Sequence, residues 1–113
     1  MNMNGSTATT LPAPPRHIVV YGRRWFQSLY GNTYHSVTVY VDGERLGYVP
    51  FEYGYGDQYL QTAMELLVKA GIYERDDEHG YIRTLSQAAR QAGDTLIYQC
   101  SDVQRRRDLK QLP

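Results

Sequence analysis

The 113-residue chain lacks several features that define common protein classes. Its single cysteine excludes an internal disulfide framework and a cysteine-rich zinc module, and fits a reducing compartment. No apolar run approaches the roughly 18 residues of a membrane span, and the N-terminal residues lack the apolar stretch of a signal peptide. We therefore expect a cytoplasmic protein that does not enter a membrane.

The chain also lacks a net charge, because 12 basic residues balance 12 acidic ones. This balance argues against a strongly basic nucleic-acid binder and against an acidic mimic of nucleic acid. The charges are unevenly placed, with a net +3 in residues 1–41, −6 in 42–79 and +3 in 80–113. Such polarity can orient an encounter with a charged partner, or it can let the two halves of the domain pack on each other.

Tyrosine is the residue type that the chain has in excess, with 11 Tyr against one Trp and two Phe. A phenol packs like a hydrophobic ring but needs its hydroxyl solvated or hydrogen-bonded, so Tyr favours boundaries and interfaces. A tyrosine-rich domain of this size therefore predicts a half-buried aromatic surface. The alternative is that Tyr replaces Phe around the rim of a small core.

The chain divides into a tail and one domain. Residues 1–16 are polar, small and proline-bearing, which predicts a disordered tail before a single domain at 17–113. Strands are predicted at 17–21, 23–30, 33–41 and 44–49. Gly22 should end or bend the first of them, and Pro50 should end the last. Asp42-Gly43 predicts a type I′ hairpin turn, and Gly31-Asn32 a second two-residue turn.

Two helices and a C-terminal strand should follow. Asp57 begins a helix whose apolar residues recur at helical spacing: Leu60, Ala63, Met64 and Leu67. Gly71 ends this helix, whereas Thr84 and Gln87 form a capping box for a second helix that ends at Gly93. Residues 95–100 predict a strand, and Ser101 should cap a short basic helix over 104–110. The fold class is α+β: an antiparallel β-meander packed against one main helix, plus a short second helix and a C-terminal strand and helix.

The two turns predict which residues face each other. They place Val39 opposite Leu46, Val37 opposite Tyr48, and Phe26 opposite Val37, which builds one apolar face for the helix to cover. The opposite face then carries aromatic, basic and polar side chains: Arg23, Trp25, Gln27, Leu29, Tyr34, Ser36, Thr38, Tyr40, Arg45 and Val49. A slip of one residue would turn every side chain to the other face.

The candidate binding residues come from this second face and from the loop predicted at 51–56: Arg23, Trp25, Tyr34, Tyr40, Arg45, Tyr53 and Tyr55. Trp, Tyr and Arg dominate the hot spots of protein interfaces, which favours a protein partner. Aromatic rings beside Arg could instead stack the bases of single-stranded RNA or DNA. A third alternative is that the second helix, the C-terminal segment or a second copy of the chain covers the face, which leaves a homodimer open.

The other chemistry-bearing residues point to no reaction. Arg105, Arg106 and Arg107 could contact phosphates or an acidic partner, or form a solvated helix face. His35 should lie on the apolar side of its strand as a hydrogen-bonded histidine at the core edge. Ser36 points the other way, so His35 cannot activate it. A small hydrolase that uses His35 is therefore the least favoured reading, and no catalytic residue is predicted.

Neither a metal nor a cofactor is predicted. Residues 76–79 are acidic but lack the glycine and the spaced ligands of a calcium loop. The Tyr53–Asp57 segment resembles a glycine loop at a helix N-terminus but lacks the Lys and Ser/Thr of a P-loop. Cys100 has no partner motif and should pack as a small hydrophobic residue.

Three strings of sequence carry a resemblance to a family. They are GNTYHSV at 31–37, DG at 42–43 and YGYGDQYLQTA at 53–63. On these strings, the segment from Trp25 to Leu67 resembles small uncharacterised proteins of bacteriophages and prophages. The resemblance implies a phage setting, where small proteins commonly bind a host factor or nucleic acid, and it implies no activity. We therefore expect a non-enzymatic phage accessory protein that binds a host protein, for example a component of a defence system. The alternative is a module that binds single-stranded RNA or DNA.

Overall fold

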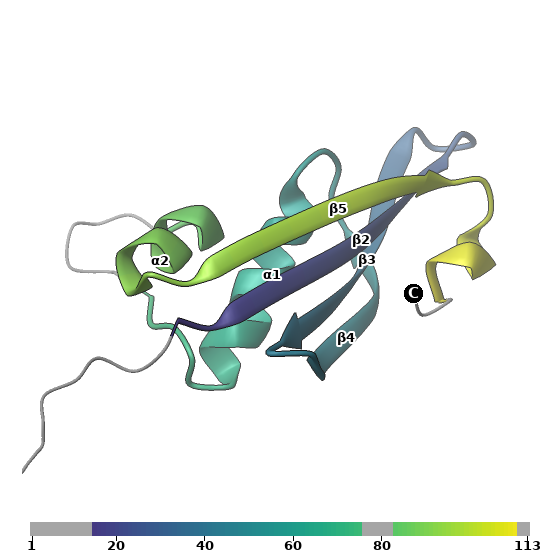
Figure 1. Ribbon diagram of the computed structural model, residues 1–113. Helices are drawn as coiled ribbons and strands as arrows, with labels where there is room; N and C mark the ends of the chain where they lie inside the picture. The colour runs from purple at the N-terminus through teal and green to yellow at the C-terminus, as the bar shows by residue number, and fades with distance from the viewer. Residues whose placement is uncertain (1–14, 76–82, 111–113) are drawn as a thin grey trace, which may run out of the picture.

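The computed structural model describes residues 15–75 and 83–110 (Figure 1). Four strands form one sheet in the order β4-β3-β2-β5. Their bounds are β2 (His17–Gln27), β3 (Asn32–Val41), β4 (Glu44–Tyr53) and β5 (Thr95–Val103). The first three form an antiparallel meander, whereas β5 runs parallel to β2 along its other side. The sheet is thus mixed, and with its helices it confirms the predicted α+β class.

Helices join the meander to β5, because a parallel neighbour can be reached only by a long crossover. They are α1 (Gln58–Lys69) and α2 (Leu85–Ala92), and a short 3-10 helix, η2 (Arg106–Lys110), follows β5. Gly71 and Gly93 have φ angles of 80° and 77° and follow the two α-helices, as predicted. The capping box of Thr84 and Gln87 is also formed. Figure 1 shows α2 beside the start of β5 and η2 beyond its far end.

The core lies between the sheet and the two α-helices. Its strand residues are aliphatic and fully buried: Ile18, Val20, Val37 and Val39. The helices contribute a second set of buried residues: Tyr59, Ala63, Met64, Leu67, Leu85, Ala88 and Ala89. Cys100 packs against the edge of this core, as its isolated position in the sequence predicts.

Gly22 does not end or bend a strand, which corrects the prediction. β2 runs without interruption from His17 to Gln27. A Cβ atom at Gly22 would lie 2.5 Å from Cδ2 of the Tyr59 ring, which is itself 3% exposed. The glycine therefore admits an aromatic ring from α1 against the backbone of β2, a role that a pattern of local residues does not reveal.

The hairpin between β2 and β3 turns earlier than predicted, at residues 28–31 rather than at Gly31-Asn32. Gln27 faces Asn32 and Trp25 faces Tyr34, and the Gly31 N–H donates to the Gln27 carbonyl at 2.9 Å. Phe26 therefore faces Thr33 rather than Val37. This shift spans an even number of residues, so the side chains of both strands keep their predicted faces. Phe26, however, lies beyond the core and is 58% exposed.

In the hairpin between β3 and β4 the predicted turn is confirmed, but the predicted register is wrong. Asp42 and Gly43 have the positive φ angles of a type I′ turn, 52° and 86°. Two register shifts then follow, so Val39 faces Gly47 and Val37 faces Val49. The predicted partners Leu46 and Tyr48 were therefore wrong. Each shift adds one unpaired residue to β4. The first, between Tyr40 and Val39, brings Val49 to the core and Tyr48 to the opposite face, and the second, between Val37 and His35, reverses the alternation again.

Two further boundaries differ from the predictions. β4 continues through Pro50 to Tyr53 because an edge strand tolerates a proline that a central strand would not. β5 continues through Ser101 to Val103, so Ser101 caps no helix. The predicted basic helix is instead the 3-10 turn η2, before which the Arg105 N–H donates to Asp108 Oδ2 at 3.2 Å.

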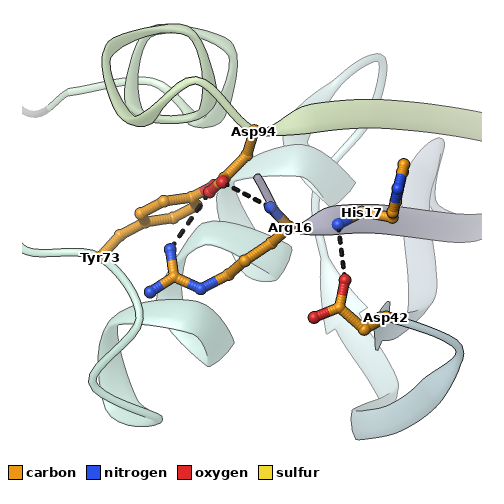
Figure 2. Close-up of polar contacts among 5 residues, drawn as sticks. All are labelled: Arg16, His17, Asp42, Tyr73 and Asp94. Atoms are coloured by element: carbon orange, nitrogen blue, oxygen red, sulfur yellow. Dashed lines mark hydrogen bonds and ion pairs between the residues drawn. The ribbon is translucent and has the colours of Figure 1, made fainter. Parts of the chain in front are cut away.

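Polar contacts hold the start of β2 in place (Figure 2). The Arg16 N–H donates to Asp94 Oδ1 at 2.9 Å, and the Tyr73 hydroxyl donates to Asp94 Oδ2 at 2.6 Å. Burial alone would raise the pKa of Asp94, but these bonds and the Arg16 guanidinium at 3.3 Å lower it. Arg16, which the sequence pattern assigns to the tail, is thus bound to the domain, while residues 1–14 lie outside the described part.

Candidate functional site

A group of aromatic side chains occupies the face of the sheet opposite α1. Tyr34 is at its centre, with ring centroids 4.5 Å from Phe51, 5.7 Å from Tyr53 and 6.0 Å from Trp25. The ring of Trp25 on β2 and the ring of Phe51 on β4 both stack on Tyr34 from the neighbouring strands, at interplanar angles of 27° and 17°. We call these four residues the aromatic cluster. Three of them are half-buried, and Tyr53 is 60% exposed.

Strand pairing brings the aromatic cluster together. Trp25 faces Tyr34 across one ladder, and Tyr34 faces Tyr53 across the next. The second register shift in β4 is needed for this arrangement, because it turns Phe51 and Tyr53 to the same face as Tyr34. Phe51 was not among the predicted members, because Pro50 suggested that the strand ends before it.

One basic side chain contacts the aromatic cluster, and others lie on the same short helix or strand. The guanidinium carbon of Arg106 lies 4.5 Å from the centroid of the Phe51 ring, a cation–π contact. Arg105 pairs with Asp108, whereas Arg107 and Lys110 are exposed on the same short helix. Arg23 precedes Trp25 by two residues on the same face of β2. Arg106 therefore places a positive charge on the aromatic cluster, and Arg23 lies along the same face.

The C-terminal helix covers part of this face. Leu109 is fully buried, and its carbonyl accepts a hydrogen bond from the Tyr48 hydroxyl at 3.3 Å. Burial raises the pKa of Tyr48, which nearby Arg23 partly offsets. Ser36 and Thr38 are also buried. The sequence left cover by the C-terminal segment open as an alternative, and the structure shows it in the middle of the face. The end that carries Tyr53 stays open.

The remaining candidate residues lie elsewhere. Tyr40 packs edge-on against Tyr21 at 6.0 Å, with Arg45 directly opposite Tyr40 on β4. A hollow of about 210 Å³, lined by Arg23, Ser36, Thr38 and neighbours, adjoins Tyr21. Tyr55 lines a different hollow with Phe26 and Thr33, which belong to the helix side of the sheet. Val49, predicted on the aromatic face, packs against the core instead.

His35 is a buried residue bonded through both ring nitrogens. Nδ1 lies 3.1 Å from the Gly54 carbonyl, which only accepts, so Nδ1 carries the proton. Nε2 then accepts from the Thr62 hydroxyl at 2.7 Å. Burial lowers the pKa of His35, although the bond to Gly54 and the charge of Glu52 act in the opposite direction. His35 thus ties β3 to the loop before α1 and to α1 itself.

The other candidates add no site. Among the described residues, no three His, Cys, Asp or Glu side chains are grouped as metal ligands. The acidic run at 76–79 lies outside the described residues. Burial raises the pKa of the Cys100 thiol. A hollow of about 450 Å³ between α1, α2 and Tyr98 is lined, in the described part of the chain, by neither His nor Cys. None of the helices in residues 15–75 and 83–110 is long and apolar enough to cross a membrane.

The fold and the site together define a small α+β domain with one aromatic, basic surface. No family model, curated protein or solved structure matches the chain.

Proposed function

We propose that this chain is a non-enzymatic accessory protein of a phage or prophage that binds an acidic surface of a host protein through the aromatic cluster. One observation carries the proposal: four aromatic rings and Arg106 form a single surface at the open end of the sheet. Trp, Tyr and Arg are the residue types that contribute most to binding energy at protein interfaces. Their preorganised stacking also lowers the entropy that binding would cost.

The arrangement of the rings favours a protein over a nucleic acid. The Tyr34 ring already stacks with Trp25 and with Phe51, and Arg106 lies over the Phe51 ring. A base that stacked on either ring would have to displace one of these contacts. A protein surface can instead pack against the ring edges and the exposed Tyr53. The surrounding Arg side chains complement an acidic partner and would speed its association.

Single-stranded RNA or DNA is the second candidate. The observation that favours it is the basic segment Arg105–Arg107, which lies beside the aromatic cluster. Guanidinium groups beside aromatic rings are typical of surfaces that follow a phosphate backbone and stack its bases.

Site-specific cross-linking tests the protein proposal. A photo-reactive phenylalanine analogue replaces Tyr53 in one variant and Tyr55 in a matched control, because both phenols are exposed but only Tyr53 belongs to the aromatic cluster. In host cells, the Tyr53 variant should cross-link a defined acidic protein that the control does not. With that protein purified, Trp25→Ala should weaken binding by roughly 30-fold, the effect of losing about 2 kcal/mol at a hot spot.

A titration of Trp25 fluorescence with a mixed-sequence single-stranded oligonucleotide separates the two candidates. The protein proposal predicts a flat signal at low and at moderate salt. Saturable quenching that weakens steeply with salt would support the nucleic-acid candidate instead. Equal cross-linking at Tyr53 and Tyr55, with no loss of binding on Trp25→Ala, would contradict the protein proposal, and a flat oligonucleotide titration would contradict the nucleic-acid candidate.

A further inference from the structure

The two edges of the sheet differ in how they resist pairing with another strand. β4 carries devices that block an edge: a proline at position 50, two register shifts, and charged Glu44, Arg45 and Glu52. β5 contains neither a proline nor a register shift. Its nine residues pair with β2 in one unbroken register from Thr95 to Val103. Its one charged side chain, Asp102, bonds Arg24 at 3.0 Å.

The hydrogen bonds to β2 show which backbone groups of β5 point outward. The Thr95 N–H donates to the Arg16 carbonyl at 2.9 Å, so Thr95 faces β2. Successive residues of a strand direct their backbone groups to alternate sides. Four residues of β5 therefore direct an N–H and a C=O away from the sheet: Leu96, Tyr98, Cys100 and Asp102. Within the described ranges, no other strand pairs with this edge.

We propose that two copies of the chain pair through β5 as antiparallel neighbours and form one continuous eight-stranded sheet. Only the outward-pointing residues can exchange hydrogen bonds, so even-numbered residues must pair with even-numbered residues of the second copy. The side chains of Leu96 and Cys100 lie on the core side of the sheet. This pairing therefore places the α-helices of both copies on one side, and both aromatic clusters on the other.

The sequence of β5 is compatible with antiparallel pairing to a second copy of itself. With Gln99 at the twofold axis, all nine residues of each strand overlap, and Tyr98 lies opposite Cys100 of the second copy. Asp102 then lies opposite Leu96 of the second copy, so no two like charges face each other. The pairing would also cover Ile97 and Tyr98, whose exposed fractions of 58% and 50% are large for apolar strand residues. This interface is separate from the aromatic cluster and does not depend on the proposed function.

The test uses the unmodified protein. Sedimentation measurements should show a twofold rise in molar mass as the concentration increases. Amide hydrogen exchange followed by NMR should then show that the N–H groups of Leu96, Tyr98 and Cys100 become protected in the dimer, whereas those of Ile97 and Gln99 are protected in both states. A monomer at the highest soluble concentration would overturn the proposal. A dimer in which the even-numbered amides exchange freely would do the same.

A pair of variants at one position separates the backbone from the side chain. Tyr98→Pro removes an outward N–H and no bond to β2, whereas Tyr98→Ala removes the ring and keeps the N–H. The proline variant should remain folded by circular dichroism and stay monomeric, and the alanine variant should still dimerise. A proline variant that dimerises like the wild type contradicts the pairing; should it fail to fold, the amide pattern of the wild type decides.

Discussion

The two faces of the sheet carry different types of side chain. The face toward α1 and α2 is aliphatic at its centre and closed, with Ile18, Val20, Val37 and Val39 fully buried. The opposite face is aromatic and basic, and a helix of five residues covers only its middle. Aliphatic side chains contribute mainly burial, whereas Trp, Tyr and Arg combine contact area with polar groups that a partner can use. The first face therefore contributes most of the stability, and the proposed binding depends on the second.

The largest difference between the two faces is expected when a buried leucine on each face is replaced by alanine. Leu67 on α1 and Leu109 on η2 are both fully buried, but on opposite faces. Leu67→Ala should lower the free energy of unfolding toward the upper end of about 2–5 kcal/mol, because the core cannot collapse into the cavity. Leu109→Ala should cost about 2 kcal/mol or less, because η2 can detach without leaving a cavity.

Urea unfolding of both leucine variants measures these costs. The Leu109→Ala variant should keep the helical content of the wild type, apart from η2, and should increase the exposure of Trp25. Equal losses of stability in the two variants would mean that the second face is a core in its own right.

A second test probes the close contact at Gly22. Gly22→Ala places a methyl group within 3 Å of two atoms of the Tyr59 ring, which is held between α1 and β2. The overpacked side chain should cost about 1–3 kcal/mol. The matched variant Gly22→Ala with Tyr59→Leu should recover part of that loss. Thermal unfolding of the two variants checks this, and no recovery in the double variant would show that the strain arises elsewhere.

The third test is the pH dependence of the helix-facing core. The pKa of His35 is lowered in the folded state, because burial disfavours the imidazolium. The unfolded chain therefore binds the proton first as the pH falls below the ordinary value of 6.5, and stability should fall from there toward the lowered pKa. In His35→Gln this slope should disappear. Denaturant midpoints between pH 7.5 and pH 5 measure it, and an unchanged slope in the variant would assign the effect to other groups.

The smallest expected effect belongs to the aromatic face. Arg106→Ala removes the guanidinium over Phe51 and should cost under about 1 kcal/mol, the range of an exposed cation–π contact. Arg107→Ala, an exposed neighbour on the same helix, is the control and should cost nothing measurable. Urea titrations compare the two. If Arg106→Ala destabilised the fold as strongly as a core substitution, the basic helix would be a structural element.

The sequence predicts much of the closed face and only part of the open one. Helix periodicity, the caps at Gly71 and Gly93 and the turn at Asp42-Gly43 depend on neighbouring residues, and all of them are confirmed. The faces of Trp25 and Tyr34 were predicted for a related reason, because alternation along a strand survives an even shift in register.

The parts that failed depend on contacts between distant segments. The register shift in β4 that brings Val49 rather than Tyr48 to the core arises where β3 and β4 meet and leaves no signal in the sequence of either strand. The ring of Tyr59 over Gly22 and the burial of Leu109 likewise join residues far apart in the chain. Residue patterns therefore identified the surface but not all of its members.

Quenching of Trp25 fluorescence tests most directly whether the second face is an open, positively charged surface. Trp25 is the only tryptophan and is half-buried in the aromatic cluster. Arg23 lies two residues before it on the same face of β2, and Arg106 lies over the Phe51 ring of the same cluster. Iodide and caesium ions approach a surface according to its charge. We predict that iodide quenches Trp25 more strongly than caesium does, and that Arg106→Ala reduces this preference. A buried emission maximum that neither ion quenches would contradict the account, because the face would then be a closed second core.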